Sequence, residues 1–202
     1  MARRKKLPVI LEPEEAEKLI RIPNKRYLSG IRNRAVLAVM LNMGLRVSEV
    51  SNLRPGDINL TKNKLRIVAG KGNVDRDMAI PFNTAELLKY WKEKKPAGTD
   101  YFFCIIKSRK NGKFSSLTGS KLSARNIQTF VKRYAVRAGV TKNISPHTLR
   151  HTFATNFYRQ TKDIETLRKL LGHANISTTQ IYITLANIDV ENAMHNFVEF
   201  KI

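Results

Sequence analysis

A polar segment near the carboxyl end of the chain, KLLGHANISTTQIYITL (169–185), holds His173 and, nine residues later, Tyr182. A tyrosine hydroxyl can serve as a nucleophile, and a histidine near it can bind an anion or transfer a proton. A tyrosine at helical spacing is nevertheless most often a packing residue with a polar tip. This segment alone leaves both interpretations of Tyr182 open.

His147 and Arg150 lie three residues apart in SPHTLRHTFAT (145–155), so both side chains project from one face of the expected helix. Ser145 as the cap and Pro146 at the first helical position place His147 in the first turn, where free amide groups and the helix dipole favour a phosphate. His147 and His151 also have the spacing of a helical zinc pair. No glutamate lies between them and no third ligand follows at a useful distance, so we expect no metal and no other cofactor.

Two more cations lie elsewhere in the chain. Arg46 follows Gly44 just past an expected helix end, and Glu49 comes three residues later. Lys71 lies at or near the tip of an expected hairpin turn, Gly70-Lys71-Gly72-Asn73. Taken alone, Arg46 and Glu49 could form an ordinary surface ion pair, and Lys71 could be a solvated lysine.

Together these segments resemble the motifs of the tyrosine recombinases, the phage integrase and Xer group, in order across roughly residues 8–200. GLRVSE (44–49) is similar to the first arginine box, and KGNVDRDMAIP (71–81) to the hairpin that carries the active-site lysine. SPHTLRHTFAT (145–155) resembles the His-x-x-Arg box, and LLGHANISTTQIY (170–182) the segment that ends at the nucleophile. The resemblance implies a catalytic set of Arg46, Lys71, His147, Arg150, His173 and Tyr182, with Glu49 as a supporting residue.

The chemistry that the resemblance implies suits these residue types. Phosphoryl transfer concentrates negative charge on the non-bridging oxygens, and a site without a metal must stabilise it with fixed cations. Arg46 and Arg150 would bind the scissile phosphate with their forked donors. Tyr182 would attack phosphorus, giving a 3′-phosphotyrosyl bond and a free 5′-hydroxyl. The bond stores the phosphodiester energy, so rejoining needs no ATP.

Three further roles follow from the same resemblance. Lys71 would act as the general acid for the 5′-oxygen, His147 would assist proton transfer at the tyrosine, and His173 would hydrogen-bond the phosphate. The expected function is therefore site-specific recombination or integration of DNA. Two alternatives stay open: a DNA-binding regulator of the same fold without catalysis, and DNA relaxation of the type IB topoisomerase kind.

The charge of the chain predicts a polyanionic partner, and double-stranded DNA is the first candidate. Lysine and arginine total 37 against 16 acidic residues, a formal net charge of +21. The stretch from Tyr101 to Lys162 holds thirteen of these cations and no acidic residue, which also leaves no carboxylate there to hold the magnesium of a metal-dependent nuclease. The single Cys104 fits a cytoplasmic protein. We see neither a signal peptide nor an apolar run of membrane-spanning length, and we expect no membrane partner.

The pattern of apolar residues predicts an α+β, mainly helical fold, a single catalytic domain with a small antiparallel β-sheet or hairpin. Asn83 or Thr84 is expected to cap one helix and Ser123 another. The segment YFFCII (101–106) reads as a strand, and residues 64–82 as the hairpin. Helices are expected over residues 12–22, 27–44, 47–54, 83–95, 123–139, 145–160, 163–172 and 189–200.

Three parts are expected along the chain: a basic arm over residues 1–12, the catalytic domain over 13–186, and a C-terminal amphipathic helix or tail over 187–202. After Lys162 the balance reverses to three basic and five acidic residues. The apolar stripe of such a terminal helix is most simply packed against its own core. In the resembled family the tail often docks on a neighbouring protomer instead, which implies self-association on DNA. Family members usually carry a separate N-terminal helical domain as well, so we expect either a catalytic fragment or a protein with a catalytic domain only.

Overall fold

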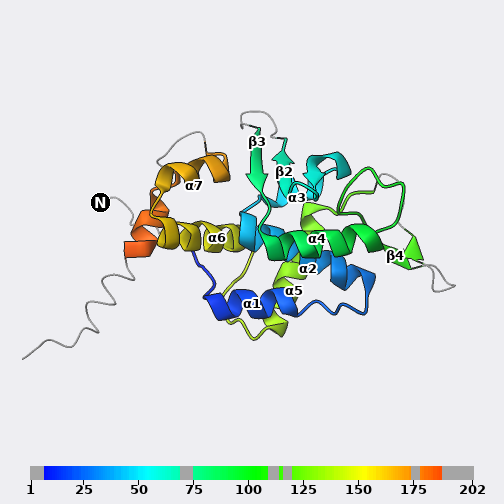
Figure 1. Cartoon of the computed structure of the whole chain (residues 1–202). Coiled ribbons are helices and arrows are strands. Elements are labelled where there is room, and N and C mark those ends of the chain that lie inside the picture. The colour runs from blue at the N-terminus through cyan, green and yellow to red at the C-terminus, as the bar shows by residue number, and fades with distance from the viewer. Residues whose placement is uncertain (1–6, 69–74, 109–113, 116–119, 174–177, 188–202) are drawn as a thin grey trace, which may run out of the picture.

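Helices dominate the protein, as the sequence predicts (Figure 1). The computed structural model describes residues 7–68, 75–108, 114–115, 120–173 and 178–187. Residues 181–187 are helical as well. The other helices are α1 (Pro13–Arg21), α2 (Leu28–Met43), α3 (Val47–Asn52), α4 (Phe82–Lys94), α5 (Ala124–Arg137), α6 (Pro146–Thr161) and α7 (Ile164–Leu171), with a short 3₁₀ turn η1 (Pro55–Asp57).

A small antiparallel sheet lies beside the helices, in the order β1-β2-β3. Its strands are β1 (Ile58–Asn59), β2 (Lys64–Ile67) and β3 (Arg76–Ala79), and a separate pair is formed by β4 (Lys107–Ser108) and β5 (Phe114–Ser115). In the hairpin of β2 and β3, Arg66 pairs with Asp77 and Ile67 with Arg76. The predicted hairpin is therefore confirmed. Its turn, with Lys71, lies outside the described residues.

Helix α2 forms the centre of the main core. Residues 35–39 are fully buried, because α1, α4 and α6 pack around this helix. It ends at Gly44, whose φ of 65° lies in the left-handed region that favours glycine. A β-carbon at Gly44 would also overlap the ring of Phe153 on α6. Gly44 thus ends the helix as predicted and also packs closely against α6. The turn at this residue sets the direction of the chain toward Arg46.

The two serine caps occur where the sequence predicts them. The Ser123 side chain accepts a hydrogen bond from the backbone N–H of Asn126 at the start of α5. The Ser145 side chain does the same for Thr148 at the start of α6, with Pro146 in the first turn. Since the Ser145 cap fixes where α6 begins, it also fixes which residues the first two turns of α6 present to the site.

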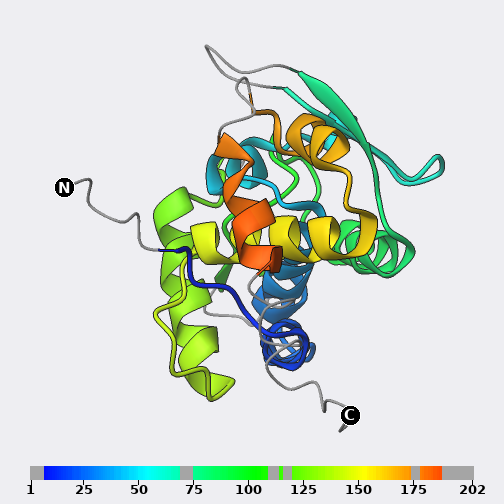
Figure 2. The same cartoon turned by 90° about the vertical axis from the view of Figure 1, so that its left-hand side faces the viewer.

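A second, smaller core holds the helical residues 181–187 in place. Figure 2 shows this helix, in orange-red, lying across α6. Because α7 ends at Gly172 in a left-handed conformation, the chain turns there toward this helix. The buried side chains of the second core are Phe153, Ala154, Leu167, Leu171, Tyr182 and Leu185.

Three local predictions are wrong. Helix α4 is capped by Pro81 and not by Asn83 or Thr84, because the Thr84 hydroxyl is buried and accepts a hydrogen bond from Asn42 instead. Residues 101–106 form no strand beyond an isolated bridge at Cys104, and the side chains of Phe102 and Phe103 pack into the core. Helix α3 ends at Asn52, two residues before the predicted end, and Pro55–Asp57 form η1.

Residues 1–6 and 188–202 lie outside the described part of the chain. All of the C-terminal helix expected over 189–200 and the first half of the basic arm fall within these two ranges. Within the described residues, no helix combines the length and apolar character that crossing a membrane requires.

Candidate active site

The site begins at the junction of α2 and α3, where Arg46 precedes the first turn of α3. The Glu49 carboxylate accepts the backbone N–H of Arg46 at 2.7 Å and the Arg46 Nη1 at 3.1 Å. A carboxylate at this position satisfies an amide that the helix leaves without a partner. The Arg46 side chain stays 27% exposed. The sequence GLRVSE therefore places an arginine at the surface of the site and a glutamate beneath it.

The side chain of Glu49 is only 8% exposed, and its carboxylate is bound by arginines from separate parts of the chain. Arg76 of β3 donates to both carboxylate oxygens, each at 3.0 Å, and Arg150 of α6 lies 3.9 Å away. Burial by itself raises the pKa of Glu49, but the hydrogen bonds and charge of Arg76 outweigh it, so the pKa lies below its ordinary value. The carboxylate is thus ionised at neutral pH.

Arg150 is almost fully buried, and helix ends hold its guanidinium. It donates to the carbonyl of Gly44 at the end of α2 and to that of Leu171 at the end of α7, both at 2.6 Å. Carbonyls at the carboxyl ends of helices carry partial negative charge, which favours a cation. Burial and the nearby charge of Arg46 lower the pKa of Arg150 to about 10. The side chain therefore stays positively charged at neutral pH.

His173 contacts Arg150 and is neutral. Its Nε2 lies 3.1 Å from Arg150 Nη2, and its Nδ1 lies 3.0 Å from the Thr179 hydroxyl. Burial, then Arg150 and other nearby arginines, lower its pKa to about 4. Because a guanidinium can only donate, Nε2 must accept from Arg150, and the ring proton is assigned to Nδ1.

Both interpretations of Tyr182, as a packing residue and as a residue of the site, agree with its position. Its ring is packed in the second core and only 2% exposed, while its hydroxyl lies 3.1 Å from Nδ1 of His151. Burial raises the pKa of Tyr182, and the charges of Arg150 and Arg46 partly offset that effect. The Tyr182 hydroxyl thus lies against α6, at the residue that follows Arg150.

The structure gathers most of the residues predicted from the sequence. Lys71 lies outside the described residues, and His147 is exposed in the first turn of α6. The predicted residues that come together are Arg46, Glu49, Arg150, His173 and Tyr182.

Arg76 and His151 belong to the site but were not predicted as parts of it. Arg76 also donates to the carbonyl of Leu170 at 2.7 Å, so it ties β3 to α7 as well as to Glu49. Strand alternation places Arg76 on the same face as the buried Met78, a signal that the sequence already contained. His151 follows His147 at helical spacing and was considered only as half of a metal pair.

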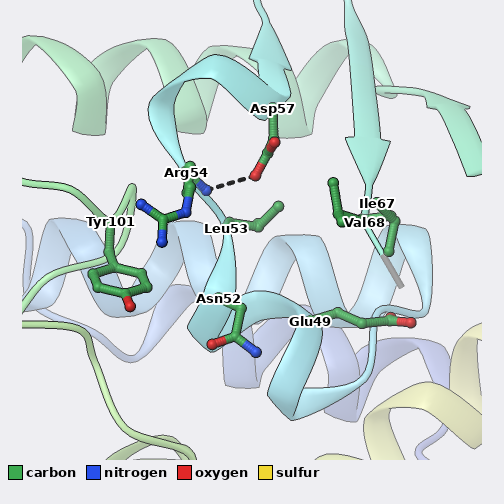
Figure 3. Close-up of a pocket in the computed structure, with 8 residues that line it drawn as sticks. All are labelled: Glu49, Asn52, Leu53, Arg54, Asp57, Ile67, Val68 and Tyr101. Atoms are coloured by element: carbon green, nitrogen blue, oxygen red, sulfur yellow. Dashed lines mark hydrogen bonds between the residues drawn. The ribbon is translucent and has the colours of Figure 1, made fainter. Parts of the chain in front are cut away.

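A hollow of about 310 Å³ lies beside α3, bordered by Glu49, by Asp57 of η1 and by Ile67 of β2 (Figure 3). Tyr101 forms one wall. The guanidinium of Arg54 lies 5.1 Å from the centre of its ring, and the ammonium of Lys121 lies 5.8 Å from it. These two cations place positive charge beside Tyr101.

The chain belongs to the phage integrase family, whose model matches residues 10–187. It is 32% identical over 194 residues to tyrosine recombinase XerD of Staphylococcus saprophyticus, covering 96% of this chain and 63% of that protein. It is 38% identical over 178 residues to tyrosine recombinase XerA of Pyrococcus furiosus, covering 88% and 58%. The chain thus spans about three fifths of the length of these relatives.

Solved structures agree in fold. A crystal structure of XerA recombinase superimposes with a TM-score of 0.76 at 27% identity, covering 98% of this chain and 68% of that one. The site-specific recombinase XerH bound to palindromic difH, in a post-cleavage complex, gives a TM-score of 0.75 at 30% identity, covering 95% and 54%. The expected tyrosine recombinase catalytic fold is therefore confirmed.

We expect Arg76→Gln to lower the free energy of unfolding by about 3 kcal/mol at pH 7, because it leaves a buried carboxylate without its bidentate partner. The folded-state pKa of Glu49 lies below its ordinary value of 4.5, so its stabilisation is present above that value. It is lost as the pH falls through the folded-state pKa. The difference between the two proteins should therefore shrink in acid. Urea unfolding at several pH values measures it.

Arg66→Gln on the neighbouring strand is the matched control. Its side chain is 65% exposed and lies 3.5 Å from Asp75, and an exposed pair of this kind contributes about 0 to 1 kcal/mol. Equal losses of stability in the two variants would contradict the special position of Arg76.

Proposed function

We propose that this chain is the catalytic part of a site-specific DNA recombinase, which cleaves and rejoins DNA through a 3′-phosphotyrosyl intermediate without metal or ATP. One observation carries the proposal: the Tyr182 hydroxyl lies 3.1 Å from His151, the residue that follows the buried Arg150 on α6, and the charges of Arg150 and Arg46 act against the rise that burial causes in its pKa. A phenol needs such a cationic site to attack a phosphodiester near neutral pH.

The arginines would divide the work on the scissile phosphate. Arg46 is partly exposed and can reach an incoming non-bridging oxygen. Arg150 is held rigidly by helix-end carbonyls, so it requires little reorganisation when charge develops. His173, neutral and bonded to Arg150, would donate to the phosphate once the anion displaces one of its present partners.

We assign proton transfer at the leaving 5′-oxygen to Lys71 and assistance at the tyrosine to His147, as the motifs imply. Two features support these roles. The β2–β3 hairpin, whose turn includes Lys71, is tied to Glu49 through Arg76. His147 lies on α6 in the turn before Arg150 and His151.

Double-stranded DNA is the proposed partner. The net charge of +21 supports it, and so does the likeness to XerH, whose structure contains its difH substrate. Arg54 and Lys121 place two further positive charges at the surface beside Tyr101. We propose that the phosphates flanking the cleavage point run across this surface.

We propose a cytoplasmic setting for this reaction. Cys104 is the single cysteine of the sequence, and its thiol is buried in the core. Burial raises the pKa of this thiol, which suits an unreactive, reduced side chain in a reducing compartment.

Tyr182→Phe is expected to abolish covalent attachment to DNA while leaving DNA affinity unchanged. The assay mixes the protein with EDTA and a labelled pool of nicked duplexes with a randomised centre, and a denaturing gel separates the adduct. Tyr158→Phe, at a partly buried tyrosine of α6, is the matched control and should still form the adduct. Binding by the wild-type protein without any adduct would contradict the proposal and favour a regulator of the same fold.

Arg54→Ala and Lys121→Ala should each lower the slope of log affinity against log salt concentration by about 1, because each removes one phosphate contact. Lys25→Ala is the control. It removes one charge from the loop between α1 and α2, which lies away from α3 and β2 in both views. Fluorescence anisotropy over a salt series measures the slopes. Equal slopes in all three variants would exclude this path for the DNA.

We also propose that the C-terminal segment mediates self-association on DNA. Its apolar residues fall on one helical stripe, Val190, Ala193, Met194, Phe197 and Val198. A chain ending at Ile188 should bind DNA without forming higher assemblies, as sedimentation of the complexes would reveal. Assembly identical to that of the whole chain would contradict the proposal.

A further inference from the structure

His151 has no part in the roles assigned above, yet it contacts the atom that reacts. Its Nδ1 lies 3.1 Å from the Tyr182 hydroxyl oxygen. The ring centres lie 5.8 Å apart, and the ring planes are tilted by 48°. A general base must lie within hydrogen-bonding reach of the proton it accepts. Among the described residues, His151 is the imidazole that meets this condition.

We propose that His151 receives the proton of Tyr182 when the phenol oxygen attacks phosphorus, an inference that rests on the function proposed above. The O–H bond of Tyr182 breaks, and its proton moves to Nδ1 of His151 while the oxygen bonds to phosphorus. The electron pair of the broken P–O bond stays on the 5′-oxygen, which takes a proton from Lys71. In rejoining, His151 returns the proton to the departing phenol.

The electrostatic surroundings make His151 a neutral acceptor. Charged and titratable groups facing it are His147 and Arg150 on its own helix, Tyr182 on the helix packed against it, and His173. Burial, then His147 and Arg150, hold the pKa of His151 below 6.5. Its lone pair is therefore available at neutral pH. A bound phosphate would offset the arginine charges and make the ring more basic at the moment of attack.

The other imidazoles of the site are less suited to this step. Both ring nitrogens of His173 are engaged, one by Arg150 and the other by Thr179. His147 is exposed in the first turn of α6. Its assistance at the tyrosine can act through His151, because the charge of His147 influences the pKa of His151.

A purely structural role for the contact would also satisfy a buried hydroxyl. His151→Asn separates the two roles, because the asparagine oxygen can take the position of Nδ1 and keep the hydrogen bond but cannot accept a proton at neutral pH. The assay measures cleavage of a nicked duplex in which sulfur replaces the bridging 5′-oxygen of the scissile phosphate. Sulfur leaves without a general acid, so Lys71 does not limit the rate.

We expect His151→Asn to slow single-turnover cleavage at pH 7 by about 10²-fold or more without changing DNA affinity. The wild-type rate should fall as the pH drops through the pKa of His151, and this acidic limb should vanish in His151→Asn. The matched variant Tyr158→Phe, at a partly buried tyrosine of the same helix, should keep the limb. A wild-type rate for His151→Asn, or the same limb in it, would overturn the proposal. Absence of any adduct in the wild-type protein would overturn both this proposal and the proposed function.

The tautomer of His151 provides a test that needs no variant of it. Acceptance by Nδ1 requires the ring proton on Nε2. Nitrogen-15 NMR of the whole chain should show Nδ1 of His151 without a proton at pH 7, and its chemical shift should change in Tyr182→Phe. A proton on Nδ1 would overturn the proposal, even if His151→Asn fails to fold.

Discussion

One buried carboxylate, that of Glu49, holds the site together. Arg46, Arg76 and Arg150 would repel one another at this distance in a dry interior, and Glu49 contacts each of them. These four side chains carry three positive charges and one negative, which leaves an excess of two. The glutamate thus permits the arginines to gather but does not neutralise them, and the remaining charge is what a phosphate can bind.

The same contacts join parts of the chain that are far apart in sequence. Arg76 connects the hairpin to α3 and to the end of α7, while Arg150 connects α6 to the ends of α2 and α7. Both helix ends use glycines in left-handed conformations, Gly44 and Gly172. A turn of that kind lets the helix stop abruptly with its last carbonyls facing inward. Helix termination and cation placement are therefore one structural feature.

Packing and chemistry coincide at Tyr182. Its ring is part of the second core, and the packing of the ring sets the position of the hydroxyl. The hydroxyl contacts His151. The usual interpretation of a tyrosine at helical spacing is therefore correct for the ring. It says nothing about the hydroxyl, whose surroundings depend on which residues of α6 and α7 face it.

The helix limits at Ser123, Gly44 and Ser145, the hairpin and the positive charge can all be predicted from the sequence, because caps, glycines and alternation act over a few residues. It also indicated most of the gathered residues through the order of their motifs. The contacts of Arg76 with Glu49 and of His151 with Tyr182 depend on tertiary packing. These partners are separated by 27 and 31 residues, and local rules do not reach across such distances. Their meeting follows from how β3, α3, α6 and the last helix pack, which is a property of the whole core.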